Sequence, residues 1–174
     1  MQDIIKKAKN IKLVIFDVDG VLTDGSLYVT HNGEEIKAFN SRDGHGMKML
    51  QNSGVTVAII TGRTSNIVTH RMKELGIEHV YQGVKNKYPA FIEILEKLSF
   101  TPAQTAYVGD DVVDLPVMSH VGLSIAVQDA HEFVKKHAHW LTPKQGGRGA
   151  GRDVCELIMD AQGNLQKELE SYLN

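Results

Sequence analysis

The stretch from residue 13 to residue 24 reads LVIFDVDGVLTD, and it decides the fold class. Its first four residues are apolar and predict a strand buried on both faces, which runs directly into Asp17, Asp19 and Gly20. A buried strand that ends in carboxylates is costly unless something at its tip neutralises the charge. Ligands bind at the carboxyl ends of parallel strands, and a hard cation such as Mg²⁺ would neutralise these acids. Taken alone, the segment also fits a strand followed by a plain Asp-Gly turn.

The rest of the chain alternates strand-like and helical segments. We expect strands at residues 56–60, 79–81, 105–108, 123–127 and 140–141, and helices at residues 65–75, 89–98, 113–121, 132–137 and 153–162. This alternation predicts an α/β fold with a doubly wound, Rossmann-like parallel sheet and helices on both faces. A chain of 174 residues buries roughly 70% of its unfolded surface, so we expect a single domain over residues 1–174.

Residues 25–41 interrupt the alternation. Two short apolar runs flank Asn32-Gly33, and Asn-Gly is the strongest short signal for a β-hairpin. The hairpin follows the acidic segment directly, so we expect it to project from the same edge of the sheet. The short interval from Asp17 to Thr61 leaves no room for a separate cap domain over the site.

Composition excludes several kinds of partner. The chain has 19 basic and 21 acidic side chains and a net charge of −2, without a basic arm or stripe, so we expect no nucleic-acid partner. No apolar run approaches the ~20 residues needed to cross a bilayer, and no signal peptide is evident, so we expect no membrane partner. The single cysteine, Cys155, cannot form an internal disulfide and fits a reducing compartment, which predicts a cytoplasmic protein.

Further polar groups follow the other predicted strands. Thr61-Gly62-Arg63 follows the strand at 56–60, Lys87 follows the strand at 79–81, and residues 109–114, GDDVVD, follow the strand at 105–108. Each feature alone fits a turn or a solvated side chain. Because the carboxyl ends of parallel strands meet at one edge of a sheet, the groups together predict one site there.

This set of motifs resembles the haloacid dehalogenase-like superfamily: Asp17-x-Asp19-Gly20, Thr61, Lys87 and Gly109-Asp110-Asp111-x-x-Asp114. The resemblance implies the strand order 3-2-1-4-5, which places Asp17 opposite Asp110 across the switch point of the sheet. It also implies a Mg²⁺-dependent phosphomonoester hydrolase, since an acid two residues after the nucleophile marks the phosphatases and phosphotransferases of the superfamily.

The resemblance implies a catalytic role for four residues. Asp17 would attack phosphorus and form an aspartyl-phosphate intermediate. Asp19 would protonate the leaving alkoxide as a general acid and then activate water as a general base. Thr61 and Lys87 would stabilise the oxygens of the transferring phosphoryl group.

The resemblance also implies a metal site. Asp17, Asp110 and the backbone carbonyl of Asp19 would bind Mg²⁺, which offsets the repulsion between the nucleophile and the phosphate. Asp111 and Asp114 would lie behind the metal ligands and orient either metal-bound water or Lys87.

Two further segments, residues 39–46 (FNSRDGHG) and 146–150 (GGRGA), are similar to those of the capless phosphatases that act on 3-deoxy-D-manno-octulosonate 8-phosphate. That family implies lipopolysaccharide precursor synthesis and a homotetramer with packed hairpins, in which a neighbour's C-terminal tail can cover the active site. Lys48 departs from some relatives, which have arginine there, and a lysine cannot make the same bidentate contact. Carried over by position, the residues facing the sugar-acid phosphate would be Asp19, Asn40, Ser41, Arg42, Asp43, Gly44, Lys48, Arg63, Arg71 and Lys87.

Three alternatives stay open. A phosphatase for another sugar-acid phosphate, such as sialic acid 9-phosphate, would share the catalytic motifs and differ only in the basic set. A signalling receiver domain also places acids, a Thr and a Lys around Mg²⁺, but its acid pair belongs at the first strand. A non-catalytic oligomerisation module would tolerate the loss of Asp17, Asp19 or Lys87, and all three are present.

The C-terminal segment, residues 143–174, is expected to contain a glycine-rich loop, the last helix and a mobile tail. Gly147-x-Gly149-x-Gly151 lacks the spacing and the strand context of a dinucleotide-binding loop. A mobile loop before the last helix is the simpler expectation. The family resemblance instead implies a tail that closes a neighbour's site.

Overall fold

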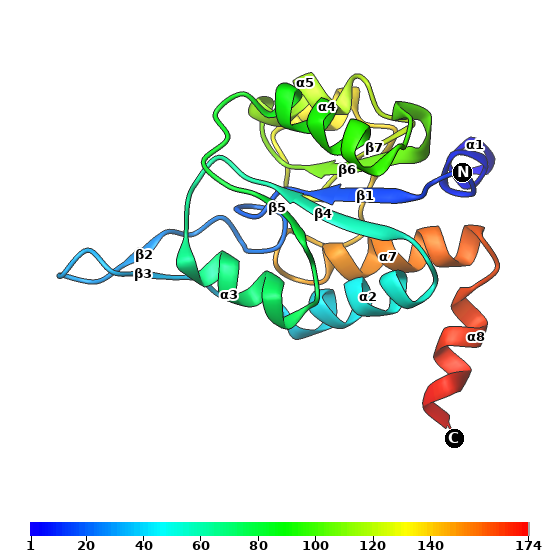
Figure 1. Cartoon of the computed structure of the whole chain (residues 1–174), viewed down its shortest axis with the longest axis horizontal. Coiled ribbons are helices and arrows are strands. Elements are labelled where there is room, and N and C mark those ends of the chain that lie inside the picture. The colour runs from blue at the N-terminus through cyan, green and yellow to red at the C-terminus, as the bar shows by residue number, and fades with distance from the viewer. Residues whose placement is uncertain (174) are drawn as a thin grey trace.

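A six-stranded parallel sheet forms the centre of the structure, a computed structural model that describes residues 1–173 (Figure 1). Its strand order is β5-β4-β1-β6-β7-β8, and every neighbouring pair is parallel. When the hairpin strands β2 and β3 are left out of the numbering, this order becomes 3-2-1-4-5-6. It is the expected order 3-2-1-4-5 with one more strand at the edge, which confirms the fold class. The strands are β1 (Leu13–Phe16), β4 (Thr56–Ile60), β5 (His79–Tyr81), β6 (Thr105–Gly109), β7 (Leu123–Ala126) and β8 (Trp140–Leu141).

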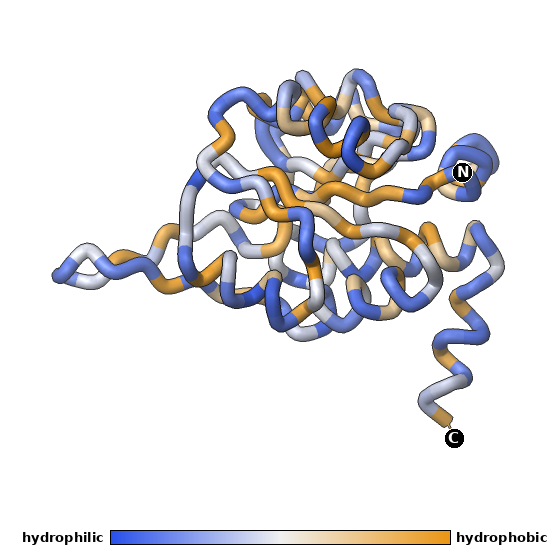
Figure 2. The backbone as a smooth tube through the Cα atoms, viewed as in Figure 1, coloured by the Kyte–Doolittle hydropathy of each residue, from blue (hydrophilic) through white to orange (hydrophobic). Residues whose placement is uncertain are grey.

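The central strand β1 is buried along its whole length, because β4 and β6 flank it and helices cover both faces. Figure 2 shows apolar residues concentrated along this strand, with polar residues on the outer turns. Phe16, the last residue of β1, lies beside Ile59 of β4 and Val108 of β6. This register brings the residues that follow the three strands to one edge of the sheet.

The helices lie in two layers. Helices α2, α3 and α7 cover one face of the sheet, where α2 packs against α7, and α4 and α5 cover the other (Figure 1). The helices are α1 (Gln2–Ala8), α2 (Ser41–Asn52), α3 (Asn66–Glu74), α4 (Lys87–Leu98), α5 (Leu115–Met118), α6 (Glu132–His137), α7 (Ala150–Ala161) and α8 (Leu165–Glu170), with 3₁₀ turns at Pro102–Gln104, Val112–Asp114 and Ser171–Leu173.

The expected hairpin is present. Strands β2 (Tyr28–Val29) and β3 (Glu35–Ile36) pair antiparallel and project away from the sheet (Figure 1). The second strand is shorter than expected, since residues 37–39 run on toward α2 without pairing. In the described chain, this hairpin and α2 are the only regular elements between β1 and β4, so no cap domain covers the site.

Helix α2 was not expected, because Gly44 and Gly46 interrupt its apolar pattern. Asn40 caps its first turn by accepting a hydrogen bond from the Arg42 backbone N–H at 2.9 Å. Both glycines lie where a side chain would collide: a Cβ on Gly44 would lie 2.3 Å from the Arg71 guanidinium. Close packing, rather than helix propensity, therefore explains the glycines.

Two other helices differ from their expected bounds. The helix expected from residue 113 begins at Leu115, because the side chains of Asp111 and Asp114 hold residues 110–114 in a tight capped turn. The last expected helix begins at Ala150 rather than at residue 153, and α8 follows it, leading away from the sheet (Figure 1). Within residues 1–173, no helix has the length and apolar character needed to span a bilayer.

Candidate active site

A cavity of about 380 Å³ opens at the carboxyl edge of the sheet, where β1, β4 and β6 end. The backbone N–H of Asp17 continues the ladder of β1 to Val108 at 3.0 Å, so Asp17 begins where the strand pairing ends. The parallel register then brings the loops after all three strands around one opening. The residues that line it are Asp17, Asp19, Thr61, Gly62, Arg63, Val84, Lys85, Lys87, Asp110, Asp111 and Val113.

Lys87 links two carboxylates beneath this cavity. It is the first residue of α4, its side chain is 2% exposed, and its Nζ lies 2.6 Å from Asp17 Oδ2 and 2.7 Å from Asp114 Oδ1. The other oxygen of Asp17 accepts from the Val18 backbone N–H at 2.6 Å. Burial lowers the pKa of Lys87, but the two carboxylates outweigh it and leave the pKa raised. The lysine is therefore charged and holds Asp17 in one orientation.

Asp114 supports the site from behind. Its Oδ1 accepts from the Tyr107 hydroxyl at 2.7 Å as well as from Lys87, and its Oδ2 accepts from the backbone N–H groups of Asp110 and Asp111 at 3.0 and 3.2 Å. The side chain is fully buried. Because protein donors already engage both of its oxygens, Asp114 fits a supporting role rather than that of a metal ligand.

Three carboxylates are crowded at this edge. Oxygens of Asp17, Asp110 and Asp114 all lie within 4.8 Å of one another. Burial, followed by the charges of Asp114 and Asp17, raises the pKa of Asp110 to about 8. Burial and the charge of Asp114 likewise raise the pKa of Asp17 to about 6, against the opposing effect of Lys87. Such a set of oxygens, short of positive charge, fits a hard divalent cation.

Gly20 allows the loop after β1, residues 17–24, to approach the carboxylate of Asp110. Its φ is +89°, and a Cβ at this position would lie 2.1 Å from Asp110 Oδ2. Both the backbone conformation and the lack of space exclude a side chain there. The Gly of the Asp-x-Asp-Gly motif is thus required by its contact with Asp110.

Asp19 lies in a charged network that the sequence did not reveal. It forms an ion pair with Lys37, whose side chain is 1% exposed and also lies 3.2 Å from Glu35. Glu35 in turn contacts Arg63 at 3.1 Å. Charged residues are common on an exposed β-hairpin, so the sequence did not indicate that Lys37 and Glu35 contact the site. Tyr107 was missed for a similar reason, because it lies within an apolar strand.

The structure brings together some of the predicted substrate-binding residues but not others. Asp19, Arg63 and Lys87 line the cavity. The remaining seven lie at α2 or on α3, and within residues 1–173 of a single chain they are not among its lining residues. They are Asn40, Ser41, Arg42, Asp43, Gly44, Lys48 and Arg71. Their role toward substrate stays a prediction.

Two of these residues, Asp43 and Arg71, have buried polar side-chain atoms. Asp43 Oδ1 accepts from the Arg152 backbone N–H at 2.8 Å and so caps the first turn of α7. Burial raises the pKa of Asp43 against this hydrogen bond. Among the described residues, Asp43 Oδ2 and Arg71 Nε are buried without a hydrogen-bond partner.

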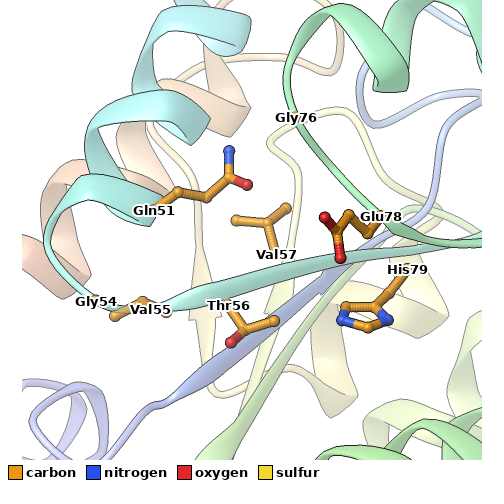
Figure 3. Close-up of a pocket in the computed structure, with 8 residues that line it drawn as sticks. All are labelled: Gln51, Gly54, Val55, Thr56, Val57, Gly76, Glu78 and His79. Atoms are coloured by element: carbon orange, nitrogen blue, oxygen red, sulfur yellow. The ribbon is translucent and has the colours of Figure 1, made fainter.

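Another cavity, of about 280 Å³, lies at the opposite edge of the sheet, at the amino ends of β4 and β5 (Figure 3). Thr56, Gln51, Glu78 and His79 border it together with glycine and valine residues. It has no convergent group of carboxylates and lysine like the one below the first cavity, so the chemistry belongs at the carboxyl edge.

Comparison with known proteins agrees with this geometry. A family model for haloacid dehalogenase-like hydrolases matches residues 79–150. The 3-deoxy-D-manno-octulosonate 8-phosphate phosphatase of Escherichia coli (strain K12) is 54% identical over 165 residues, which cover 95% of this chain and 88% of the relative. The chain belongs to this phosphatase family. It is therefore a member of the haloacid dehalogenase-like superfamily, as the motifs predicted.

Solved structures from the family have the same fold. A phosphatase of this name from Moraxella catarrhalis, solved in complex with magnesium ion, phosphate ion and KDO, superimposes with a TM-score of 0.97 at 42% identity and covers 99% of both chains. A probable phosphatase from Pseudomonas syringae pv. phaseolica superimposes with a TM-score of 0.99 at 53% identity, covering 100% of this chain and 99% of that one.

Proposed function

We propose that this protein hydrolyses 3-deoxy-D-manno-octulosonate 8-phosphate to the free sugar acid and phosphate, with Mg²⁺, in lipopolysaccharide precursor synthesis. The observation that carries the proposal is the buried Asp17–Lys87 pair beside Asp110, at the motif positions of a chain 54% identical to a phosphatase of that name. A receiver domain or a non-catalytic module could carry the same three groups, but neither would be 54% identical to a phosphatase of this family.

Asp17 is the nucleophile in this account. Lys87 and the Val18 N–H hold its two oxygens, so the carboxylate faces the cavity in a fixed orientation. Attack on phosphorus forms an aspartyl-phosphate and releases the sugar alkoxide. The ammonium group of Lys87 and the hydroxyl of Thr61 stabilise the charge on the transferring phosphoryl oxygens.

Asp17, Asp110 and the backbone carbonyl of Asp19 are the groups that would hold Mg²⁺. Burial and the charges of the neighbouring carboxylates raise the pKa values of Asp17 and Asp110, and a cation bound between the two groups would lower both values. When bound, the ion offsets the repulsion between these carboxylates and the substrate phosphate. Asp114 fixes the backbone that carries Asp110.

Asp19 is the general acid and base. Its carboxyl group donates a proton to the leaving alkoxide and then accepts one from the water that attacks the aspartyl-phosphate, a role worth roughly 10²- to 10⁴-fold. The ion pair with Lys37 fixes its side chain at the base of the hairpin. Asp19 therefore links the catalytic loop to the hairpin.

Assembly would complete the substrate site. We expect a homotetramer in which the hairpins pack together, because Leu27, Tyr28, Val29 and Ile36 are each at least half exposed on a projecting element. Arg42, Lys48 and Arg71 would then face the sugar carboxylate in the assembled site. A cytoplasmic location is consistent with Cys155, which is free and buried and whose pKa is raised by burial.

The test is phosphate release by Asp17→Asn with 3-deoxy-D-manno-octulosonate 8-phosphate and Mg²⁺. We expect a loss of roughly 10⁴-fold in kcat, with an unchanged circular dichroism spectrum, because an asparagine amide cannot replace the carboxylate as nucleophile. Asp160→Asn, an exposed acid on α7, is the matched control and should keep wild-type activity. Activity of Asp17→Asn within tenfold of wild type would remove Asp17 as the nucleophile.

A further inference from the structure

We infer that the glycine-rich segment, defined here as residues 143–149, is a positioning element for the catalytic loop, residues 17–24. The sequence alone favoured a mobile loop in this place. The described contacts instead pack its backbone directly against the loop that carries Asp19. The inference rests on the proposed function, because the role of Asp19 in leaving-group protonation is what the positioning serves.

The backbone of the glycine-rich segment lies directly against the backbone of the catalytic loop. A Cβ on Gly146 would lie 1.7 Å from the carbonyl oxygen of Gly20, and a Cβ on Gly147 would lie 2.4 Å from the carbonyl carbon of Thr23. The Gly147 N–H donates to the Val21 carbonyl at 2.9 Å. Only glycines leave enough room for these two segments to approach so closely.

Gly20 is held between two neighbours. Its carbonyl lies against Gly146, and the position of its missing Cβ lies against the carboxylate of Asp110. Arg148 adds an ion pair to Asp24 at 3.0 Å at the end of the catalytic loop. Any displacement of Gly20 by residue 146 must therefore move the adjacent Asp19, or change the approach to Asp110.

The segment is itself anchored. The Gly146 N–H donates to Asp129 Oδ1 at 2.8 Å, and the buried Thr142 hydroxyl donates to the Lys144 carbonyl at 2.6 Å. The Lys144 N–H donates to Asp153 Oδ2 at 3.1 Å, and the side chains of Lys144 and Asp153 form an ion pair. These tethers join the segment to the core and to α7, so it can transmit support to the catalytic loop.

The first test variant is Gly146→Ala, with Gly122→Ala as its matched control. A Cβ on Gly122 would lie 2.3 Å from the Ala103 carbonyl oxygen, so both variants press a methyl group against a backbone carbonyl. Gly122 precedes β7 at the amino edge of the sheet, opposite the active site. A general loss of packing affects both variants, whereas a displaced catalytic loop affects only Gly146→Ala.

The readout is the ratio of kcat/KM for the sugar-acid phosphate to kcat/KM for p-nitrophenyl phosphate. Both values report steps up to release of the alcohol, and their ratio does not depend on the fraction of folded enzyme. The sugar alkoxide needs protonation by Asp19, while p-nitrophenolate leaves without it. We expect Gly146→Ala to lower this ratio at least tenfold and Gly122→Ala to leave it unchanged.

A second pair of variants covers the possibility that Gly146→Ala fails to fold. Asp129 is exposed, so Asp129→Ala removes the tether to the Gly146 N–H without opening the core. Asp129→Asn keeps an acceptor oxygen at the same place. We expect Asp129→Ala to lower the ratio of kcat/KM values severalfold and Asp129→Asn to keep a ratio close to that of wild type.

Mg²⁺ binding gives a readout without catalysis. The midpoint of Mg²⁺-induced thermal stabilisation should shift to at least tenfold higher Mg²⁺ in Gly146→Ala, because Gly20 lies against Asp110. Wild-type enzyme that hydrolyses neither substrate contradicts the proposed function, and the Mg²⁺ midpoint then decides the inference alone. Unchanged ratios and unchanged midpoints in both Gly146→Ala and Asp129→Ala overturn the inference.

Discussion

At the scale of single residues, the close approach of three carboxylates lowers the stability of the metal-free protein. Asp17, Asp110 and Asp114 are held close together, and within residues 1–173 the cation in direct contact with them is Lys87, which pairs with Asp17 and Asp114. Burial and the neighbouring carboxylates raise the pKa of Asp110 from its ordinary 3.8 to about 8. Between these two pH values the folded state binds a proton that the unfolded state has lost, so metal-free stability falls as pH rises through this window.

Asp110→Asn should therefore change both the stability of the metal-free protein and its dependence on pH. In EDTA at pH 8 the variant should be more stable than wild type by about 1 kcal/mol, since it removes a carboxylate whose charge is disfavoured by burial and by its acidic neighbours. Its stability should change less than that of wild type between pH 5 and about 8, and Mg²⁺ should no longer stabilise it. Urea unfolding with and without Mg²⁺ measures all three effects.

Asp160 lies on α7 and is not part of the carboxylate cluster, so Asp160→Asn should show none of these changes. The account of the crowded carboxylates is contradicted if Asp110→Asn is less stable than wild type in EDTA at pH 8. It is also contradicted if Mg²⁺ stabilises the variant as strongly as it stabilises wild type.

The residues that could be predicted from sequence are those whose chemistry is unusual at their position. Acids that follow an apolar strand, as Asp17 and Asp110 do, signal a site because burial of charge is costly. Lys37 and Tyr107 carried no such signal. Lys37 contacts Asp19 only because the chain that leaves the hairpin after β3 passes beside the loop after β1. Tyr107 joins the site because the carboxylate of Asp114 lies against its hydroxyl.

At the scale of elements, apolar runs predicted β1, β4, β6 and β7, because a strand covered on both faces must be apolar. The part-buried edge strands β5 and β8 were predicted from the alternation of strands and helices. Helix α2 was not predicted, because Gly44 and Gly46 interrupt its local pattern. Both glycines make room for Arg71 and Arg152, which are distant in sequence. The glycine-rich segment was likewise interpreted as mobile, since its contact with Gly20 joins parts of the chain far apart in sequence.

The hairpin leads to a prediction about assembly. Val29 is 61% exposed on the hairpin, so Val29→Glu should place a charge in the interface of the proposed tetramer and dissociate it. Sedimentation velocity should show a smaller species, and kcat/KM for the sugar-acid phosphate should fall at least tenfold. The matched control is Phe133→Glu, which changes an exposed apolar residue on α6 instead.

A wild-type protein that sediments as a monomer would contradict the role given to the hairpin. The same conclusion follows if Val29→Glu remains a tetramer with full activity. Loss of activity in both Val29→Glu and Phe133→Glu, without dissociation, would also contradict it.

At the scale of the whole molecule, the predicted catalytic residues and most of the predicted substrate-binding residues lie in different places. One chain places the proposed nucleophile Asp17, the proposed acid and base Asp19, and Asp110 of the proposed metal site around a single cavity. Arg42, Lys48 and Arg71 lie at α2 and α3, outside the described lining of that cavity, and would reach the substrate through assembly. The catalytic motifs alone could not have predicted this division, because they are common to phosphatases with different substrates.

The most direct test of the account is phosphate release by the purified wild-type protein with Mg²⁺ and with EDTA. The substrates are 3-deoxy-D-manno-octulosonate 8-phosphate, sialic acid 9-phosphate and simple sugar phosphates. We predict metal-dependent release with a preference of about 100-fold or more for the octulosonate, equivalent to about 2.7 kcal/mol of differential transition-state binding. Equal rates on all substrates would contradict the substrate assignment, and release that persists in EDTA, or no release at all, would contradict the proposed chemistry.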